Sequence, residues 1–188
     1  MNNMNIYLIT NNYFFYLGLS GYIKNLAKVR MLTTISNNDS DLITPDDVIL
    51  ISKDSLESTP GIIIEALKLV NGKIEHIFID SAHETYGKCR LKFKTFNSRG
   101  QLRSIRGIIL NLYRDKPSFS HYVKLSIKET EVLFLLKKGL RGVDISRMWM
   151  CSPKTVYTHK CQALKKIGVK RFSTLINHTK CNIQERGD

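Results

Sequence analysis

The stretch that decides the fold is residues 125–169, which read LSIKETEVLFLLKKGLRGVDISRMWMCSPKTVYTHKCQALKKIGV. Its first part contains Ser126 and, three positions on, Glu129. A serine and a glutamate at this spacing form a capping box, because each side chain accepts a hydrogen bond from a free backbone N–H group of the other residue. We therefore expect a helix that begins here, buries Val132, Leu133 and Leu136, and stops at Gly139.

Two further helices follow in the same stretch. A short one is expected from about Gly142 to Trp149. Ser152 and Pro153 then predict the beginning of another helix. A serine side chain can accept a hydrogen bond from a free N–H group of the first turn, and a proline at the first helical position has no N–H group that would be left unpaired. This helix is expected to run to Ile167 and to end at Gly168.

The residues of this last helix divide between two faces at 100° per residue. One face is apolar and consists of Val156, Ala163 and Ile167. The other is short, polar and basic, and it carries Lys154, Tyr157, Thr158, Cys161 and Lys165. A helix with such a face, held by a preceding helix across a tight turn, fits the major groove of B-DNA.

These residues resemble the LuxR-type helix-turn-helix domain in order and spacing. The matching positions, over about 45 residues, are Leu125-Ser126, Glu129, Glu131-Val132-Leu133, Leu136, Gly139-Leu140, Asp144-Ile145-Ser146, Ser152, Thr155-Val156, His159 and Lys166-Ile167-Gly168-Val169. The sequence departs from the family's pattern at Trp149, at Gly142-Val143 and at Ala163, which affects packing more than the polar face.

The resemblance implies four helices, with the third in the major groove and the fourth, about Ser173 to His178, often used to dimerise. It places Tyr157, Thr158 and Cys161 where the family contacts base edges. It places Lys154, Thr155, Lys160 and Lys165 near DNA phosphates. His159 and Trp149 are expected to pack inside the domain.

The net positive charge of the chain favours a polyanionic partner. Nucleic acid is the preferred candidate, and an anionic membrane is the second. The chain has 188 residues, 29 Lys and Arg, 16 Asp and Glu, and a formal net charge of +13. Residues 1–87 carry 6 basic and 10 acidic side chains, residues 88–115 carry 8 and 1, and residues 116–188 carry 15 and 5. The positive field therefore belongs to the second half of the chain.

The first half alternates short apolar runs with helical patterns. Strands are expected at Ile6–Ile9, Val48–Ile51 and Ile77–Ile79, and helices at Phe14–Leu26, Gly61–Val70 and Gln101–Tyr113. Alternation of this kind is typical of a parallel α/β sandwich. The expected organisation is a receiver-like α/β domain over residues 1–115, a linker over 116–122, and an all-α domain of four helices over 123–188.

The first domain resembles a phosphoacceptor receiver that has lost its chemistry. Such a domain needs a carboxylate pair after the first strand to hold Mg²⁺ and an aspartate after the third strand to accept phosphate. This sequence has Thr10 and Asn11 at the first place and Ser52 at the second. Asp54 and Asp80 remain as candidate acids for this domain, but they are interpreted first as turn residues. The basic run Lys88–Lys94 is expected to be an exposed edge strand, or alternatively to extend the DNA surface.

These features favour a cytoplasmic bacterial transcription regulator that is not controlled by aspartate phosphorylation. It is expected to act as a homodimer or as an auxiliary partner of another response regulator. The alternative is a protein antagonist that sequesters another regulator without binding DNA. An enzyme is disfavoured because no catalytic dyad or phosphate loop is present. The four cysteines contain no CxxC pair, so neither a metal nor a cofactor is expected.

Overall fold

The computed structural model describes residues 4–33, 43–44, 47–70, 76–80, 93–98, 102–114 and 125–176. The N-terminal part contains β1 (Asn5–Ile9), α1 (Tyr13–Ile23), β2 (Lys28–Leu32), β3 (Val48–Ile51), α2 (Lys53–Ser58), α3 (Ile62–Val70), β4 (His76–Asp80), β5 (Lys94–Phe96) and α4 (Leu102–Arg114). The C-terminal part contains α5 (Ile127–Lys137), α6 (Gly142–Met148), α7 (Pro153–Ile167) and α8 (Phe172–Ile176). The linker expected at 116–122 lies outside the described residues.

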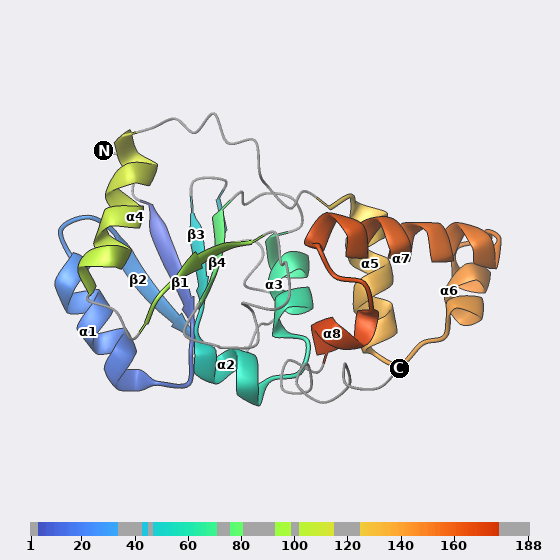
Figure 1. Cartoon of the computed structure of the whole chain (residues 1–188), viewed down its shortest axis with the longest axis horizontal. Coiled ribbons are helices and arrows are strands. Elements are labelled where there is room, and N and C mark those ends of the chain that lie inside the picture. The colour runs from blue at the N-terminus through green and yellow to red at the C-terminus, as the bar shows by residue number, and fades with distance from the viewer. Residues whose placement is uncertain are drawn as a thin grey trace, which may run out of the picture.

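The five strands form one parallel sheet in the order β2-β1-β3-β4-β5 (Figure 1). This is the strand order of the flavodoxin-like, doubly wound fold. The three predicted strands are confirmed as β1, β3 and β4. The sequence patterns did not predict β2, α2 or β5. The two strands are short and contain charged residues, and α2 has only six residues.

Strand residues alternate between two apolar layers, as a pleated sheet requires. On one face, Ile6 and Leu8 of β1 pack with residues of α1 and α4. On the other face, Tyr7 and Ile9 belong to the cluster that contains the side chains of α2 and α3. The receiver-like domain is therefore a sheet between two helical layers.

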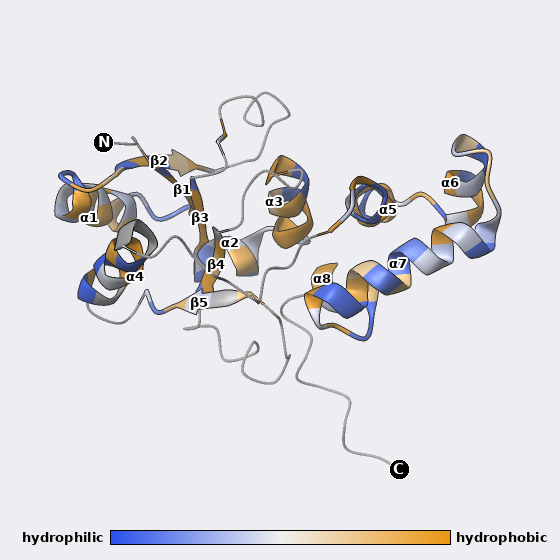
Figure 2. Cartoon of the chain, turned by 90° about the horizontal axis from the view of Figure 1, so that it is seen from above, coloured by the Kyte–Doolittle hydropathy of each residue, from blue (hydrophilic) through white to orange (hydrophobic). Residues whose placement is uncertain are grey.

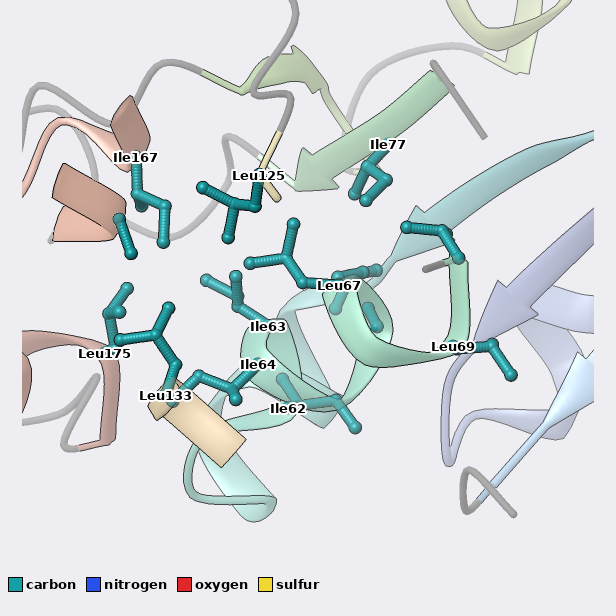
Figure 3. Packing of buried hydrophobic residues seen from close by; sticks show 14 of the residues in the cluster. Ile62, Ile63, Ile64, Leu67, Leu69, Ile77, Leu125, Leu133, Ile167 and Leu175 are labelled. Carbon is teal, nitrogen blue, oxygen red and sulfur yellow. The ribbon is translucent and has the colours of Figure 1, made fainter. Parts of the chain in front are cut away.

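Helix α3 is buried on more than one side, and this joins the two halves of the chain. Its buried residues are Ile62, Ile63, Ile64, Ala66, Leu67, Leu69 and Val70. Figure 3 shows its side chains between Ile77 of the sheet and Leu133, Ile167 and Leu175 of the helical domain. Figure 2 shows the same hydrophobic helix between the sheet and α5. The two domains thus share one apolar cluster in this arrangement.

Polar contacts accompany this interdomain packing. The Lys137 ammonium of α5 forms an ion pair with the Glu65 carboxylate of α3, and the Lys68 ammonium lies 3.6 Å from the centre of the Phe134 ring. Gly61, which precedes α3, has φ +69 and closely approaches α8. A Cβ atom there would lie 3.1 Å from Cδ1 of Ile176, so glycine permits both the backbone turn and the contact.

Candidate nucleic-acid interface

Helix α7 begins and ends as its sequence predicts. The Ser152 hydroxyl accepts a hydrogen bond of 3.1 Å from the backbone N–H of Thr155, and Pro153 occupies the first helical position. At the other end, Gly168 adopts the left-handed conformation with φ 91. These two caps define the ends of the helix, which spans Pro153–Ile167 and is long enough to present four turns of side chains to a partner.

The two predicted faces of α7 are present. Val156, Ala163 and Ile167 are buried, and Leu164 joins them. On the rest of the helix, Lys154, Thr155, Tyr157, Thr158 and Lys165 are exposed, while Lys160 and Cys161 are half-buried. The structure therefore gives solvent-accessible surface to all seven side chains expected to contact DNA.

Local contacts fix what three of these side chains present to a partner. The Thr158 hydroxyl donates a hydrogen bond of 2.9 Å to the carbonyl oxygen of Lys154, which leaves its methyl group and an oxygen lone pair free. The neighbouring Cys161 side chain raises the pKa of the Tyr157 hydroxyl above its ordinary value. The Lys160 ammonium lies 5.0 Å from the centre of the Tyr157 ring.

The acids of the helical domain that the structure describes are all engaged away from this face. Residues 125–176 contain 11 basic and 3 acidic side chains. The acids pair as Glu129 with Lys166, Glu131 with Lys128, and Asp144 with Arg141 and Arg147. Within the described part of the chain, Lys154, Lys160 and Lys165 have no ion pair with a carboxylate. Their charge is therefore available to a polyanion.

Helices α5 and α6 hold α7 in place. The Glu129 carboxylate is buried; it accepts a hydrogen bond of 2.7 Å from the backbone N–H of Ser126 and one of 2.7 Å from Lys166 of α7. Burial alone raises the pKa of Glu129, but the hydrogen bonds from Lys166 and Ser126 outweigh it and hold that pKa below its ordinary value. Glu129 thus remains charged and joins the first helix to the third.

His159 and Trp149 contact each other inside the domain, as expected. Their rings meet edge to face with centroids 6.1 Å apart, and both residues are half-buried. His159 is therefore directed toward the packing side of α7 rather than toward the polar face. The turn before α7 contains Met150, a non-glycine residue with φ 51 whose side chain is 96% exposed.

The carboxyl edge of the sheet is the second polar cluster. Thr10 and Ser52 follow β1 and β3, and both are buried. The Thr10 hydroxyl lies 3.1 Å from both oxygens of the Asp54 carboxylate, which also accepts hydrogen bonds from the backbone N–H of Asn11 and from the Ser52 hydroxyl. Asp54 therefore joins three residues that follow two different strands.

The interpretation of Asp54 and Asp80 as turn residues was wrong. Asp54 lies in the first turn of α2, and Asp80 is the last residue of β4 and fully buried. The Asp80 carboxylate accepts hydrogen bonds from the backbone N–H groups of Lys53, at 3.2 Å, and Ser98, at 3.1 Å. Their spacing after apolar runs pointed to the strand ends, but the sequence carried no signal for these long-range partners.

Two other kinds of site are absent from the described residues. Their His, Cys, Asp and Glu side chains form no group of three or more that could hold a metal ion. None of the helices in this part of the chain combines the length and the apolar character that a membrane span requires. The basic run Lys88–Lys94 lies mostly outside the described residues; only Phe93 and Lys94, the first residue of the edge strand β5, are described.

Comparison with known proteins identifies the helical part. Residues 123–179 match the GerE family, described as bacterial regulatory proteins of the luxR family. No curated protein sequence is detectably similar to the chain. Among solved structures, full-length FixJ from B. japonicum is 16% identical, with 93% of this chain and 95% of that chain covered and a TM-score of 0.45.

The response regulator RcsB from Salmonella typhimurium is also similar, at 20% identity over 96% of this chain and 100% of that chain, with a TM-score of 0.41. Another RcsB structure, from Salmonella enterica serovar Typhimurium and bound to the promoter rprA, is 17% identical over 93% and 98% of the two chains, with a TM-score of 0.43. C-terminal to its receiver-like α/β domain, this chain carries a helix-turn-helix domain of the luxR family of bacterial regulatory proteins.

Proposed function

We propose that the chain is a sequence-specific, DNA-binding transcription regulator of the bacterial cytoplasm, controlled by association with another chain and not by phosphorylation of an aspartate. The observation that carries this proposal is the outer face of α7, where exposed polar side chains lie beside lysines that no acid of the described residues neutralises. The domain limits proposed with it are residues 1–115 and 123–188, with the linker between them.

The proposed contacts follow from the chemistry of each side chain. Tyr157, Thr158 and Cys161 face the base edges, because they are short or planar groups on the middle of the helix face. Thr158 presents a methyl group and an acceptor, since its hydrogen is already donated to Lys154. This combination suits a thymine methyl or an exocyclic amine of adenine or cytosine.

The lysines supply the electrostatic part of binding. Lys154, Lys160 and Lys165, together with the Thr155 hydroxyl, are proposed to contact phosphates on either side of the groove. Such contacts release counterions, so affinity falls with salt at a slope of about −0.9 per neutralised phosphate.

The experiment that tests DNA binding is a salt titration of affinity, by fluorescence anisotropy, with the full chain. Lys154→Ala, Lys160→Ala and Lys165→Ala are each expected to flatten the slope by about one unit. Lys53→Ala is the matched control, because Lys53 belongs to α2 of the other domain and pairs with Glu57. A salt-independent affinity, or equal slopes in all five proteins, would falsify the proposal.

The residues at the sheet edge support the proposed absence of phosphorylation. Thr10, Asn11 and Ser52 offer neutral oxygens, which bind a hard divalent cation poorly, and a serine hydroxyl cannot form an acyl phosphate. The Asp54 carboxylate beside them is already hydrogen-bonded to all three residues. Incubation with acetyl phosphate and Mg²⁺ is expected to change neither the mass of the protein nor its DNA affinity. A gain of one phosphoryl group with tighter binding would contradict this part.

A further inference from the structure

Helix α3 is covered on all sides, although it belongs to an outer layer of the sheet domain. None of its nine residues, Ile62–Val70, is exposed. Its two charged side chains both contact α5 of the helical domain. Glu65 pairs with Lys137, and the Lys68 ammonium lies 3.6 Å from the centre of the Phe134 ring. A helix that is covered all round belongs to a core and not to a surface, so the helical domain completes the packing of α3.

The contact between the two domains is mainly apolar. Leu133 of α5 and Leu175 of α8 are at most 1% exposed, and they share one cluster with Ile63 and Ile64 of α3 (Figure 3). Domains of one chain move relative to each other by default, unless the interface between them is large and hydrophobic. Separation of these domains would expose apolar side chains on both of them to water, so the docked arrangement is favoured.

Helix α8 takes part in this contact. Leu175 is buried, and Phe172 and Ile176 pack against the same apolar cluster. Gly61, just before α3, comes so close to α8 that a Cβ atom there would lie 3.1 Å from Cδ1 of Ile176. The resemblance to the luxR family implies that the fourth helix dimerises. In this chain, however, the apolar side of that helix is already covered by the chain itself.

The outer face of α7 stays open in the docked arrangement. With both domains present, Lys154, Thr158 and Lys165 are exposed, and Tyr157 is 62% exposed. The N-terminal half of α7 lies next to α6, at the end of the molecule away from the sheet (Figures 1 and 2). Among the described residues, nothing has to move to uncover this face.

Helix α5 connects the interdomain contact to α7. It packs on α3 and also on α7, where the Glu129 carboxylate accepts a hydrogen bond of 2.7 Å from Lys166. Its buried residues Val132 and Leu133 belong to the same cluster as Ile167 of α7. Removing α3 would therefore expose one side of the helix that holds α7 in place.

We propose that the contact of α3 with α5 and α8 is a permanent interdomain joint. The two domains stay docked when the chain binds DNA, and α8 anchors the helical domain to its own chain and is not a dimerisation helix. A regulatory partner then meets one rigid unit and does not act by releasing the helical domain. The part of this proposal that concerns DNA rests on the proposed function, whereas the joint itself does not.

The first test follows unfolding of the full chain in urea, without DNA, by the fluorescence of Trp149. This is the only tryptophan of the sequence, and it lies at the end of α6 in the helical domain. Glu65→Lys sets two ammonium groups against each other across the joint. It is expected to lower the urea midpoint that Trp149 reports, although Glu65 belongs to the other domain. Adding Lys137→Glu restores an ion pair of reversed sign and should recover most of the loss.

Glu57→Lys is the matched control. It makes the same change of charge in the same domain, but Glu57 pairs with Lys53 of its own helix, at 3.5 Å. Because an exposed pair of this kind contributes little to stability, Glu57→Lys is expected to shift the Trp149 midpoint much less than Glu65→Lys does. A midpoint that Glu65→Lys leaves unchanged would mean that the two domains unfold independently, and it would overturn the joint.

The second test is hydrogen–deuterium exchange of the natural full chain, read by mass spectrometry with and without mixed-sequence duplex DNA. The backbone amides of α3 are expected to exchange no faster in the complex, because docked domains keep them covered. Faster exchange of these amides in the complex would show that the domains separate on DNA, which contradicts the proposal. This measurement needs no variant, so it does not depend on whether Glu65→Lys folds.

DNA affinity distinguishes a permanent joint from an inhibitory contact. Glu65→Lys and Glu57→Lys have the same net charge, so their long-range attraction to DNA is similar. Because α5 loses support in Glu65→Lys, this variant is expected to bind the same duplex several-fold less tightly than Glu57→Lys. Equal or tighter binding would show that α7 does not depend on the docked arrangement. If the natural chain binds no DNA while the Trp149 results hold, the proposed function fails and the joint remains.

Discussion

The carboxyl edge of the sheet and the outer face of α7 both gather hydroxyl, amide and charged side chains, but the two clusters use them differently. At the sheet edge, Thr10 and Ser52 are buried and their hydroxyls lie within hydrogen-bond distance of the Asp54 carboxylate. On α7, Lys154, Tyr157 and Lys165 are exposed, and the three acids within residues 125–176 pair elsewhere.

The difference is between polar groups that are hydrogen-bonded within the protein and polar groups that remain free to bind a partner. A buried polar group must be paired within the protein, because leaving it unpaired costs about 1–3 kcal/mol. A cluster that is paired internally contributes to stability and has little left for a ligand. An exposed cluster of cations without acids contributes little to the fold, and its free energy is realised on a partner.

The largest expected effect is on stability at the sheet edge. Asp54→Ala removes the acceptor shared by Thr10, Asn11 and Ser52, and it is expected to lower the free energy of unfolding by about 2–3 kcal/mol. Urea unfolding measures this loss. Asp54→Asn keeps one oxygen acceptor and should lose less. If Asp54→Ala leaves stability unchanged, or alters the salt dependence of DNA affinity, then the cluster at the sheet edge does not serve mainly to stabilise the fold.

The reverse pattern is expected on α7. Tyr157→Ala and Thr158→Ala should each reduce discrimination between the preferred and a mismatched site by ~10- to 100-fold, with the melting temperature nearly unchanged. Competition binding with single-base variants of the site measures the loss. If Tyr157→Ala instead unfolds the domain, then the face of α7 that carries Tyr157 is a packing face, contrary to its exposure.

The helical domain could be predicted from its sequence because its signals are local. A capping box at Ser126, a proline at the start of α7 and a glycine at its end act within four residues, and all three have the predicted geometry. The sheet was predicted less completely. Parallel strands pair residues far apart in the chain, and β2 and β5 are edge strands whose sequences lack a long apolar run.

The candidate site shows the same division. Exposure of the predicted α7 residues followed from helical periodicity alone. The role of Asp54 did not, because it depends on how β1 and β3 bring Thr10 and Ser52 to one place. The interdomain contact of α3 was also beyond the sequence: an apolar helix shows that it is buried, but not that it is buried against two domains.

A smaller effect on stability is expected at Glu129, a buried carboxylate that pairs with the partly exposed Lys166. Its pKa is held below the ordinary value, so the carboxylate contributes stability above the pKa of an unfolded glutamate and loses that contribution as the pH falls through the folded pKa. Glu129→Gln should cost about 1 kcal/mol near neutral pH, a modest value because Lys166 is partly exposed.

Urea unfolding over a range of pH checks this. The gap between the natural chain and Glu129→Gln is expected to shrink from about pH 5 downward. Glu131→Gln is the matched control, because the Glu131 side chain is 42% exposed and pairs with Lys128 of its own helix, so its loss should cost little stability near neutral pH. A gap that stays constant down to about pH 3 would mean that the Glu129 charge is not what stabilises the contact with α7.

The smallest effect concerns Met150, the one described non-glycine residue with a positive φ, at 51°. This conformation is strained for a side chain, and the methionine is 96% exposed, so the fold gains nothing from it. Met150→Gly is therefore expected to raise the free energy of unfolding by about 0.5–1 kcal/mol. The relief of strain is partly offset by the greater freedom of glycine in the unfolded chain.

The Met150 side chain, which the fold does not use, is available to a partner, like the exposed lysines of α7. Because Met150 lies in the turn that precedes α7, Met150→Gly should also bind DNA a few-fold less tightly. Met148→Gly, a change at the last residue of α6, should instead lower the stability of the domain, because glycine is a poor helix former. A more stable Met150→Gly protein with unchanged DNA affinity would show that exposure and strain together do not mark a contact here.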